Sequence, residues 1–247
     1  MNKPAPAAAP PVTMPANMPL GLFVFTLLYG GMTVLAGVLA FKQVQLWPTD
    51  LAVEGGIFAF LNDLAVESGI FAFLMLVVIS STFAQLYGKR LANQIVIFGF
   101  LPLVLSIGLM GLVLWLPVSP EMVAGRPGAI EAFEFVHGQY WRVVASGPVA
   151  YFVSLFLNIW IFDRLRGSGE ATTASLMMRG AVASALSQAV DSVIFVTLAF
   201  YGQFDISGLL IGQVIAKVIL SIVLVPFLIT GGVKAARWLD GRGDKAG

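Results

Sequence analysis

The sequence alternates long apolar runs with short breaks that are polar or rich in glycine and proline. A helix needs roughly 20 mostly apolar residues to cross the hydrocarbon core of a bilayer. Six runs reach about that length: Leu20–Leu46, Ile70–Tyr87, Leu91–Leu116, Trp141–Phe162, Ala174–Tyr201 and Ile206–Gly231. The pattern therefore predicts an all-α integral membrane protein with six transmembrane helices.

The basic residues fall unevenly on the two sides that these spans define. Lys and Arg concentrate in cytoplasmic loops. Only Arg126 and Arg142 lie on one side, whereas the other holds Lys3, Lys89, Arg90, Arg164, Arg166, Lys234, Arg237, Arg242 and Lys245. The side with few basic residues carries the acidic Asp50, Glu54, Asp63, Glu67, Glu121, Glu131, Glu134 and Asp205. We therefore expect both termini to lie in the cytoplasm.

The two ends of the chain differ in composition from the apolar centre. Residues 1–19 are rich in Ala and Pro, and Lys3 is their only charge. Such a segment cannot bury enough apolar surface to fold, so it predicts a disordered tail. Residues 20–232 then form the six-helix membrane domain, and residues 233–247 form a basic cytoplasmic tail.

The first external loop contains a tandem duplication. Residues 50–62 read DLAVEGGIFAFLN and residues 63–75 read DLAVESGIFAFLM, so eleven of thirteen positions match. The second copy continues into the second predicted span. The first copy would rise only about 20 Å as a helix, which is too short to cross the membrane. We therefore expect it to form an extra short external or re-entrant segment.

Composition excludes several classes of function. Apolar residues make up 58% of the 247 and charged residues 11%, with a net charge near +1. Such a chain has no basic field for nucleic acid. It contains no cysteine and one histidine, His137, which removes disulfides, Cys/His metal sites and thiol or Ser-His nucleophiles. We expect no enzyme activity, no metal and no cofactor.

Four charged residues lie inside or at the edge of the apolar runs: Lys42, Arg179, Asp191 and Lys217. An ionised group at such depth costs several kcal/mol unless it is paired or hydrated. Counted inward from the external turn after Tyr201, Asp191 and Lys217 both lie about 15 Å deep and could pair. One interpretation is a solute site, and the other is a structural ion pair between the fifth and sixth spans.

A polar stripe on the fifth span strengthens the first interpretation. Ser184, Gln188, Asp191 and Phe195 follow the spacing of one helix face. Gln and Asp could satisfy the ring donors and acceptors of a planar heterocycle while Phe covers its face. The alternative is that the stripe only holds helices together by hydrogen bonds.

Other polar residues are weaker candidates for the same cavity. Arg179 points away from the stripe and is expected to snorkel or pair near the interface. Lys42 is either a snorkelling anchor or part of the site. Gly208, Gly212 and Ala216 form a small-residue ridge for close helix packing, with Gln213 and Lys217 beside it. The remaining uncharged candidates are Ser81, Gln85 and Asn158.

Several motifs occur together along the chain. Lys42 closes the first span, YGKRLA follows the second at 87–92, and RGAVASALSQAVDSVIFVTLAFYG occupies 179–202, followed by Lys217 and Pro226. From about residue 20 to 229 the chain resembles the bacterial queuosine precursor transporters, also called the VUT family. The resemblance implies uptake of a 7-deazaguanine base across the bacterial inner membrane by a multi-pass protein.

The chain departs from that family at acidic positions. The family usually carries an acidic pair where Ser81 and Gln85 stand here, and an acidic residue is common where Asn158 stands. Asp191 is then expected to be the only acidic residue deep in the spans.

The leading hypothesis is import of a small purine-like solute. Asp191 and Gln188 would read the ring edge, Phe195 would stack, and Lys217 would balance the carboxylate. Gln85, Asn158 and Ser184 would complete the pocket. No Walker motif is present, so energy would come from a gradient, from trapping of the solute or from separate subunits.

The sequence leaves two alternative functions open and does not fix the oligomeric state. The chain could be the substrate-binding membrane subunit of an energy-coupling-factor type vitamin importer, or a membrane scaffold that transports nothing. The expected partners are a small-molecule substrate and the lipid bilayer, and a homodimer is compatible with the sequence.

Overall fold

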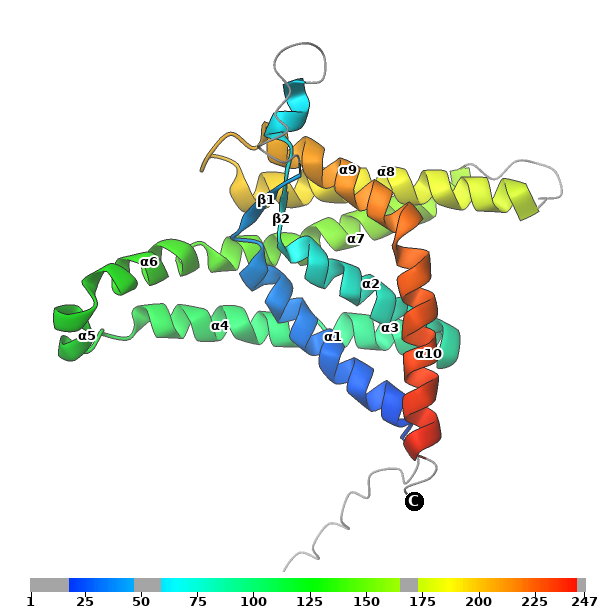
Figure 1. Ribbon diagram of the computed structural model, residues 1–247, viewed down its shortest axis with the longest axis horizontal. Helices are drawn as coiled ribbons and strands as arrows, with labels where there is room; N and C mark the ends of the chain where they lie inside the picture. Colours follow the sequence, from blue (N-terminus) through cyan, green and yellow to red (C-terminus); the bar gives the residue numbers. More distant parts are fainter. Residues whose placement is uncertain (1–17, 47–58, 165–172, 244–247) are drawn as a thin grey trace, which may run out of the picture.

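The chain folds into long helices that surround a small β-hairpin (Figure 1). The computed structural model describes residues 18–46, 59–164 and 173–243, without the side chains of residues 60, 158, 159, 162, 163, 173–181, 242 and 243. The elements in chain order are α1 (Leu20–Leu39), β1 (Gln43–Gln45), η2 (Ala59–Asp63), β2 (Ala65–Glu67), α2 (Gly69–Leu86), α3 (Lys89–Phe98), α4 (Leu101–Trp115), α5 (Pro120–Gly125), α6 (Pro127–His137), α7 (Tyr140–Arg164), α8 (Thr173–Phe200), α9 (Ser207–Val223) and α10 (Val225–Gly243).

The helices agree with a protein that crosses a membrane several times. Within the described ranges, five helical segments are long and apolar enough to span a bilayer, and α9 with α10 adds a sixth if this bent pair is one span. These are α1, α2, α3 with α4, α6 with α7, and most of α8. Each of the six predicted apolar runs falls largely on helical residues, although several of the predicted boundaries are wrong.

The first predicted span is too long at its C-terminal end. Helix α1 ends at Leu39, not at Leu46, and Gln43–Gln45 form strand β1. The alternation of Gln43, Val44 and Gln45 has the two-residue period of a strand, and only Val44 turns its side chain toward the protein. Unlike the all-α prediction, the fold therefore contains a short two-stranded sheet.

The third and sixth predicted spans are each broken into two helices. Helix α3 ends at Phe98 and α4 begins at Leu101, next to Pro102. Helices α9 and α10 meet at Leu224 with a bend of 54°. Pro226 explains this bend, because its ring carries no N–H for the preceding turn and excludes a straight continuation. Helix α10 then continues to Gly243 through much of the segment that the sequence assigns to a basic tail.

The β-hairpin packs against α9 through glycine. Strands β1 and β2 are antiparallel, with Gln43 opposite Glu67 and Gln45 opposite Ala65. A Cβ atom at Gly212 would collide with the carbonyl oxygen of Ala65, and one at Gly208 would collide with that of Asp63. The close packing predicted for this small-residue ridge is present, but its partner is the backbone around β2 instead of another helix.

The first and last described helices meet at one side of the molecule. The carboxylate of Asp240, near the end of α10, accepts hydrogen bonds from the Gly21 backbone N–H at 2.7 Å and from the Tyr87 hydroxyl at 2.8 Å. Tyr87 directly follows α2, so the start of α1 and the ends of α2 and α10 lie together (Figure 1). The placement of this side in the cytoplasm stays a prediction.

Candidate functional site

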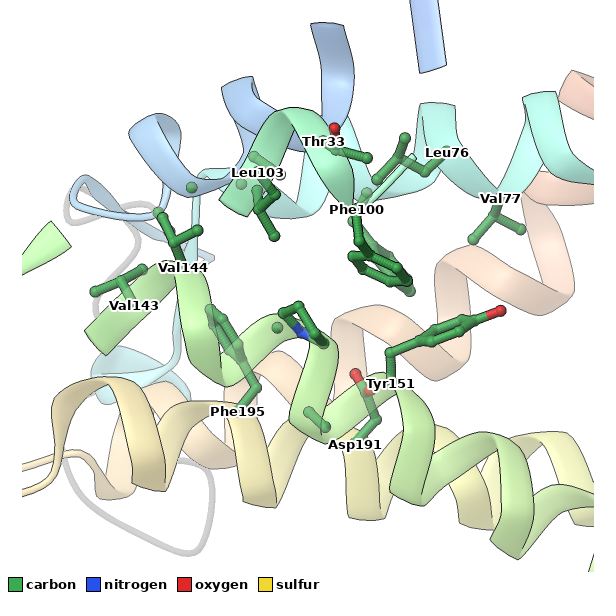
Figure 2. A pocket seen from close by; sticks show the side chains of 18 of the residues that line it. Thr33, Leu76, Val77, Phe100, Leu103, Val143, Val144, Tyr151, Asp191 and Phe195 are labelled. Carbon is green, nitrogen blue, oxygen red and sulfur yellow. The ribbon is translucent and has the colours of Figure 1, made fainter. Parts of the chain in front are cut away.

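A cavity of about 160 Å³ lies between α1, α2, α4, α7, α8 and α9. Its walls are mostly apolar, and the aromatic side chains along them are Tyr29, Phe73, Phe100, Tyr151 and Phe195. Figure 2 shows Phe100, Tyr151 and Phe195 around the space, with Asp191 reaching into it from α8. The cavity is therefore a mainly apolar chamber with five aromatic side chains and two acidic groups on its wall.

The two charged residues predicted to lie deep in the fifth and sixth spans form an ion pair at this cavity. Lys217 Nζ of α9 lies 2.6 Å from Asp191 Oδ2 of α8, and both residues line the chamber. They are buried, with exposed fractions of 5% and 7%. The other carboxylate oxygen, Asp191 Oδ1, accepts a hydrogen bond of 3.2 Å from the Ser154 hydroxyl of α7. Three helices thus meet at one carboxylate.

Aromatic rings surround the ammonium group of Lys217. Its Nζ lies 4.7 Å from the centre of the Phe73 ring and 5.9 Å from the centre of the Phe195 ring. The negative face of an aromatic ring attracts a cation at these distances. Phe73 and Phe195 therefore interact favourably with the ammonium of Lys217 in a mostly apolar wall.

The other polar residues of the predicted stripe, Gln188 and Ser184, form hydrogen bonds within α8 and between α8 and α9. Gln188 Nε2 donates to Ser184 Oγ at 3.0 Å, and Gln188 Oε1 accepts from the Ser221 hydroxyl at 2.7 Å. Neither Gln188 nor Ser184 lines the cavity, whereas Asp191 and Phe195 do. The four stripe residues are therefore divided between a hydrogen-bonded helix contact and the cavity wall.

A buried glutamate, which the sequence places in the external loop, completes the wall. Glu67 of β2 is 4% exposed and lines the cavity. Its Oε1 accepts a hydrogen bond of 2.8 Å from Gln213 Nε2, and the Glu67 backbone N–H donates to Gln213 Oε1 at 3.3 Å. Its Oε2 has no hydrogen-bond partner among the described residues. Glu67 is therefore a second acidic residue at the cavity, contributed by β2 and not by one of the predicted spans.

The environment of Glu67 favours the protonated carboxyl. Burial is the largest effect and raises the pKa of Glu67 to about 7, although the ammonium of Lys217, the amide of Gln213 and the backbone N–H groups of Gly69 and Ile70 act in the opposite direction. Glu67 lies in a strand outside the membrane-spanning helices, and its residue type alone suggests an exposed loop. The sequence signal that could have pointed to Glu67 was Gln213, because an amide inside an apolar span needs a buried hydrogen-bond partner.

The remaining candidates lie apart from the cavity. Lys42 and Gln85 are exposed, and neither lines the chamber. Gln213 is fully buried behind the wall, where it holds Glu67. The side chains of Asn158 and Arg179 lie outside the described part of the chain.

A proline interrupts the hydrogen bonding of α7 beside the cavity. Pro148 lies inside this helix and lines the cavity together with Val144. Proline carries no N–H, so the carbonyl of the residue four positions earlier, Val144, loses its usual helical donor.

Within the described ranges, no three His, Cys, Asp or Glu side chains gather closely enough to hold a metal ion.

Comparison with protein families gives one match. The model of the family described as "Putative vitamin uptake transporter" matches residues 67–231, about two thirds of the chain. The matched region begins at Glu67 and includes Asp191 and Lys217. Comparison with curated proteins and with solved structures gives no match.

This family consists of transporters and not of enzymes. A transporter of this kind sits in a lipid bilayer and binds a small molecule, which agrees with the apolar helices and with the buried cavity. The chain is therefore a multi-pass membrane protein that belongs to the vitamin uptake transporter family.

Proposed function

We propose that this transporter imports a small planar solute, and specifically a 7-deazaguanine base of the kind used to make queuosine, across the bacterial inner membrane. The observation that carries the proposal is the pairing of Asp191 with Lys217 on the wall of a mostly apolar cavity that contains several aromatic rings. A carboxylate and an ammonium are costly at this depth. A site that binds a polar ring gives them a function.

The aromatic side chains match the shape of such a solute. Phe100, Tyr151 and Phe195 enclose the space around Asp191 (Figure 2). Aromatic rings stack well on a flat heterocycle, and a carboxylate accepts hydrogen bonds from its ring N–H and amino groups. We assign the reading of the ring edge to Asp191, the stacking to Phe195 and the charge balance to Lys217.

We assign indirect, supporting roles to most of the other predicted residues. Gln188 and Ser184 hold α8 against α9 through Ser221, and Gln213 fixes the glutamate on β2. Their effect on the solute would be indirect, through the position of the wall. Lys42 and Gln85 lie away from the chamber and have no part in the proposed site.

Uptake of labelled deazaguanine precursors into cells that cannot make queuosine tests the function. Cells with the wild-type protein should accumulate label, and Asp191→Asn should reduce accumulation at least tenfold. Asp63→Asn is a matched control, because Asp63 is exposed in η2. It should retain wild-type uptake.

Two results would count against the proposal in different ways. Equal uptake by wild type and Asp191→Asn would remove Asp191 from the site. No uptake by either protein, together with uptake of a labelled water-soluble vitamin, would replace the deazaguanine by that vitamin. Co-purification of ATPase subunits would instead favour the energy-coupling-factor arrangement.

A further inference from the structure

The cavity wall carries more acidic than basic side chains. Among the described residues that line it, Asp191 and Glu67 are acidic and Lys217 is the one basic residue. The two oxygens of Asp191 are both occupied, one by Lys217 and the other by Ser154. Lys217 is therefore already neutralised, and Glu67 has no positive partner of its own in direct contact.

Glu67 is held in place but left half unsatisfied. Gln213, which is fully buried, binds both the carboxylate Oε1 and the backbone N–H of Glu67. Oε2 is buried at a cavity wall and makes no hydrogen bond of good geometry in the described ranges, although the backbone N–H groups of Gly69 and Ile70 lie near the carboxylate. A buried carboxylate without a counter-charge is very unfavourable, whereas a neutral carboxylic acid is tolerated. The arrangement thus stabilises a protonated Glu67.

We propose that Glu67 is the proton-binding residue that couples uptake to the proton gradient. The inference rests on the proposed transport of a small solute through this cavity, but not on the identity of that solute. In each cycle a proton from the external water forms an O–H bond at Oε2. The same bond breaks when Glu67 faces the cytoplasm, and the proton passes to water there. One proton enters with each turn of the cycle, and Glu67 returns to its starting form.

The donor set favours a proton over a metal cation. Hard cations need several oxygen ligands, and the described residues contain no cluster of three acidic or histidine side chains. A proton needs a single free oxygen, which Glu67 Oε2 supplies. The raised pKa of Glu67, about 7, also lets the group bind and release a proton near neutral pH.

The groups that face Glu67 explain how the solute could control this proton. Lys217 and Gln213 approach from α9, Asp191 lies on α8, and the titratable tyrosines at the wall are Tyr29 on α1 and Tyr151 on α7. Helix α2 contributes the backbone N–H groups of Gly69 and Ile70, which favour the ionised carboxylate, and a side chain at Gly69 would come within 2.5 Å of Oε2. A solute that draws Asp191 away from Lys217 would leave the ammonium free to favour ionised Glu67 and so promote proton release.

Infrared titration of the purified protein tests the proton site without any solute. The wild type should show a protonated carboxyl band that disappears as the pH rises through about 7. Glu67→Gln should lack this band, and the matched control Glu131→Gln, at an exposed position of α6, should keep it. An unchanged band in Glu67→Gln would overturn the proposal.

A second acidic variant keeps the test decisive if Glu67→Gln does not fold. Glu67→Asp keeps the acid but shortens the side chain, which draws it away from Gln213. The titration midpoint of the band should then shift by at least half a pH unit. A midpoint equal to that of the wild type would assign the band to another carboxyl group.

Transport in liposomes tests the coupling, with the labelled deazaguanine as probe. An imposed gradient, acidic outside, should drive accumulation by the wild type and by Glu131→Gln. Glu67→Gln should lose this accumulation at least tenfold but retain exchange of labelled for unlabelled solute. Gradient-driven accumulation by Glu67→Gln would overturn the coupling. Loss of exchange in the wild type as well would count against the deazaguanine alone, since the infrared result does not depend on it.

Discussion

Lys217 Nζ and Asp191 Oδ2 lie 2.6 Å apart and join α9 to α8 at the wall of the cavity. The two residues are separated by 26 positions, and the turn between α8 and α9 brings them side by side. Their charges cancel where water is scarce. The pair therefore has both a structural consequence, because it links two helices, and a proposed functional one, because it faces the chamber.

Removal of one member of this pair should destabilise the protein more than removal of both. Asp191→Asn or Lys217→Met leaves one buried charge unpaired, which costs about 3 kcal/mol or more. The double variant Asp191→Asn with Lys217→Met contains no buried charge at this point and should melt above either single variant. Thermal unfolding in detergent measures this, with Asp63→Asn as the exposed control. A double variant less stable than both single variants would contradict the electrostatic explanation.

The pH dependence of stability should reveal Glu67. Its pKa is raised from 4.5 to about 7, so the folded protein holds this proton more tightly than the unfolded chain. The resulting stabilisation is greatest below about pH 4.5 and is lost as the pH rises through about 7. Glu67→Gln should therefore lose less stability than the wild type between about pH 5 and pH 8.

Melting curves across that pH range provide the measurement. The exposed variant Glu131→Gln should follow the wild-type pH dependence. If Glu67→Gln also follows it, the buried carboxyl does not titrate differently in the folded and unfolded states.

Gly212 should be far less tolerant of a side chain than Gly111. A Cβ at Gly212 collides with the Ala65 carbonyl of β2, whereas one at Gly111 in α4 meets no atom within 4 Å. Gly212→Ala should cost about 1 to 3 kcal/mol through forced displacement of the hairpin. Gly111→Ala should be neutral or stabilising by up to about 1 kcal/mol, because alanine favours the helix. Equal melting temperatures for the two variants would mean that the hairpin yields easily.

Asp240 should anchor the start of α1. Its carboxylate accepts the Gly21 N–H and the Tyr87 hydroxyl, so Asp240→Ala removes two hydrogen bonds and the acceptor at a helix N-terminus. We expect a loss of about 1 to 2 kcal/mol and faster hydrogen exchange in the first turn of α1. Tyr87→Phe removes one of the bonds and should have a smaller effect. Unchanged exchange in Asp240→Ala would show that α1 is held by other contacts.

Single cysteines should test the orientation in the membrane. The chain contains no cysteine, so no background substitution is needed. Lys89 at the start of α3 and Gly125 at the end of α5 are both exposed and lie on opposite sides in the predicted topology. An impermeant maleimide should label Gly125→Cys in intact cells and Lys89→Cys only after permeabilisation. The reverse pattern would invert the topology.

The sequence by itself determined where the apolar helices lie and that Asp191 and Lys217 could pair. Both follow from distances along a helix, since the rise per residue is fixed and a charge within an apolar run is visible in one dimension. The same reasoning identified the Gly208 and Gly212 ridge as a place of close packing. It could not name the partner, because that contact joins α9 to a strand nearly 150 residues earlier in the chain.

Only the tertiary structure decided which residues share the cavity. Glu67 belongs to a segment that resembles an external loop, and its burial depends on the return of the hairpin between α2 and α9 and on the amide of Gln213. Conversely, Gln188 lies on the same helix face as Asp191 but accepts a hydrogen bond from Ser221 instead of lining the cavity. Helical spacing fixes the face on which a side chain lies, whereas its partner depends on how distant segments pack.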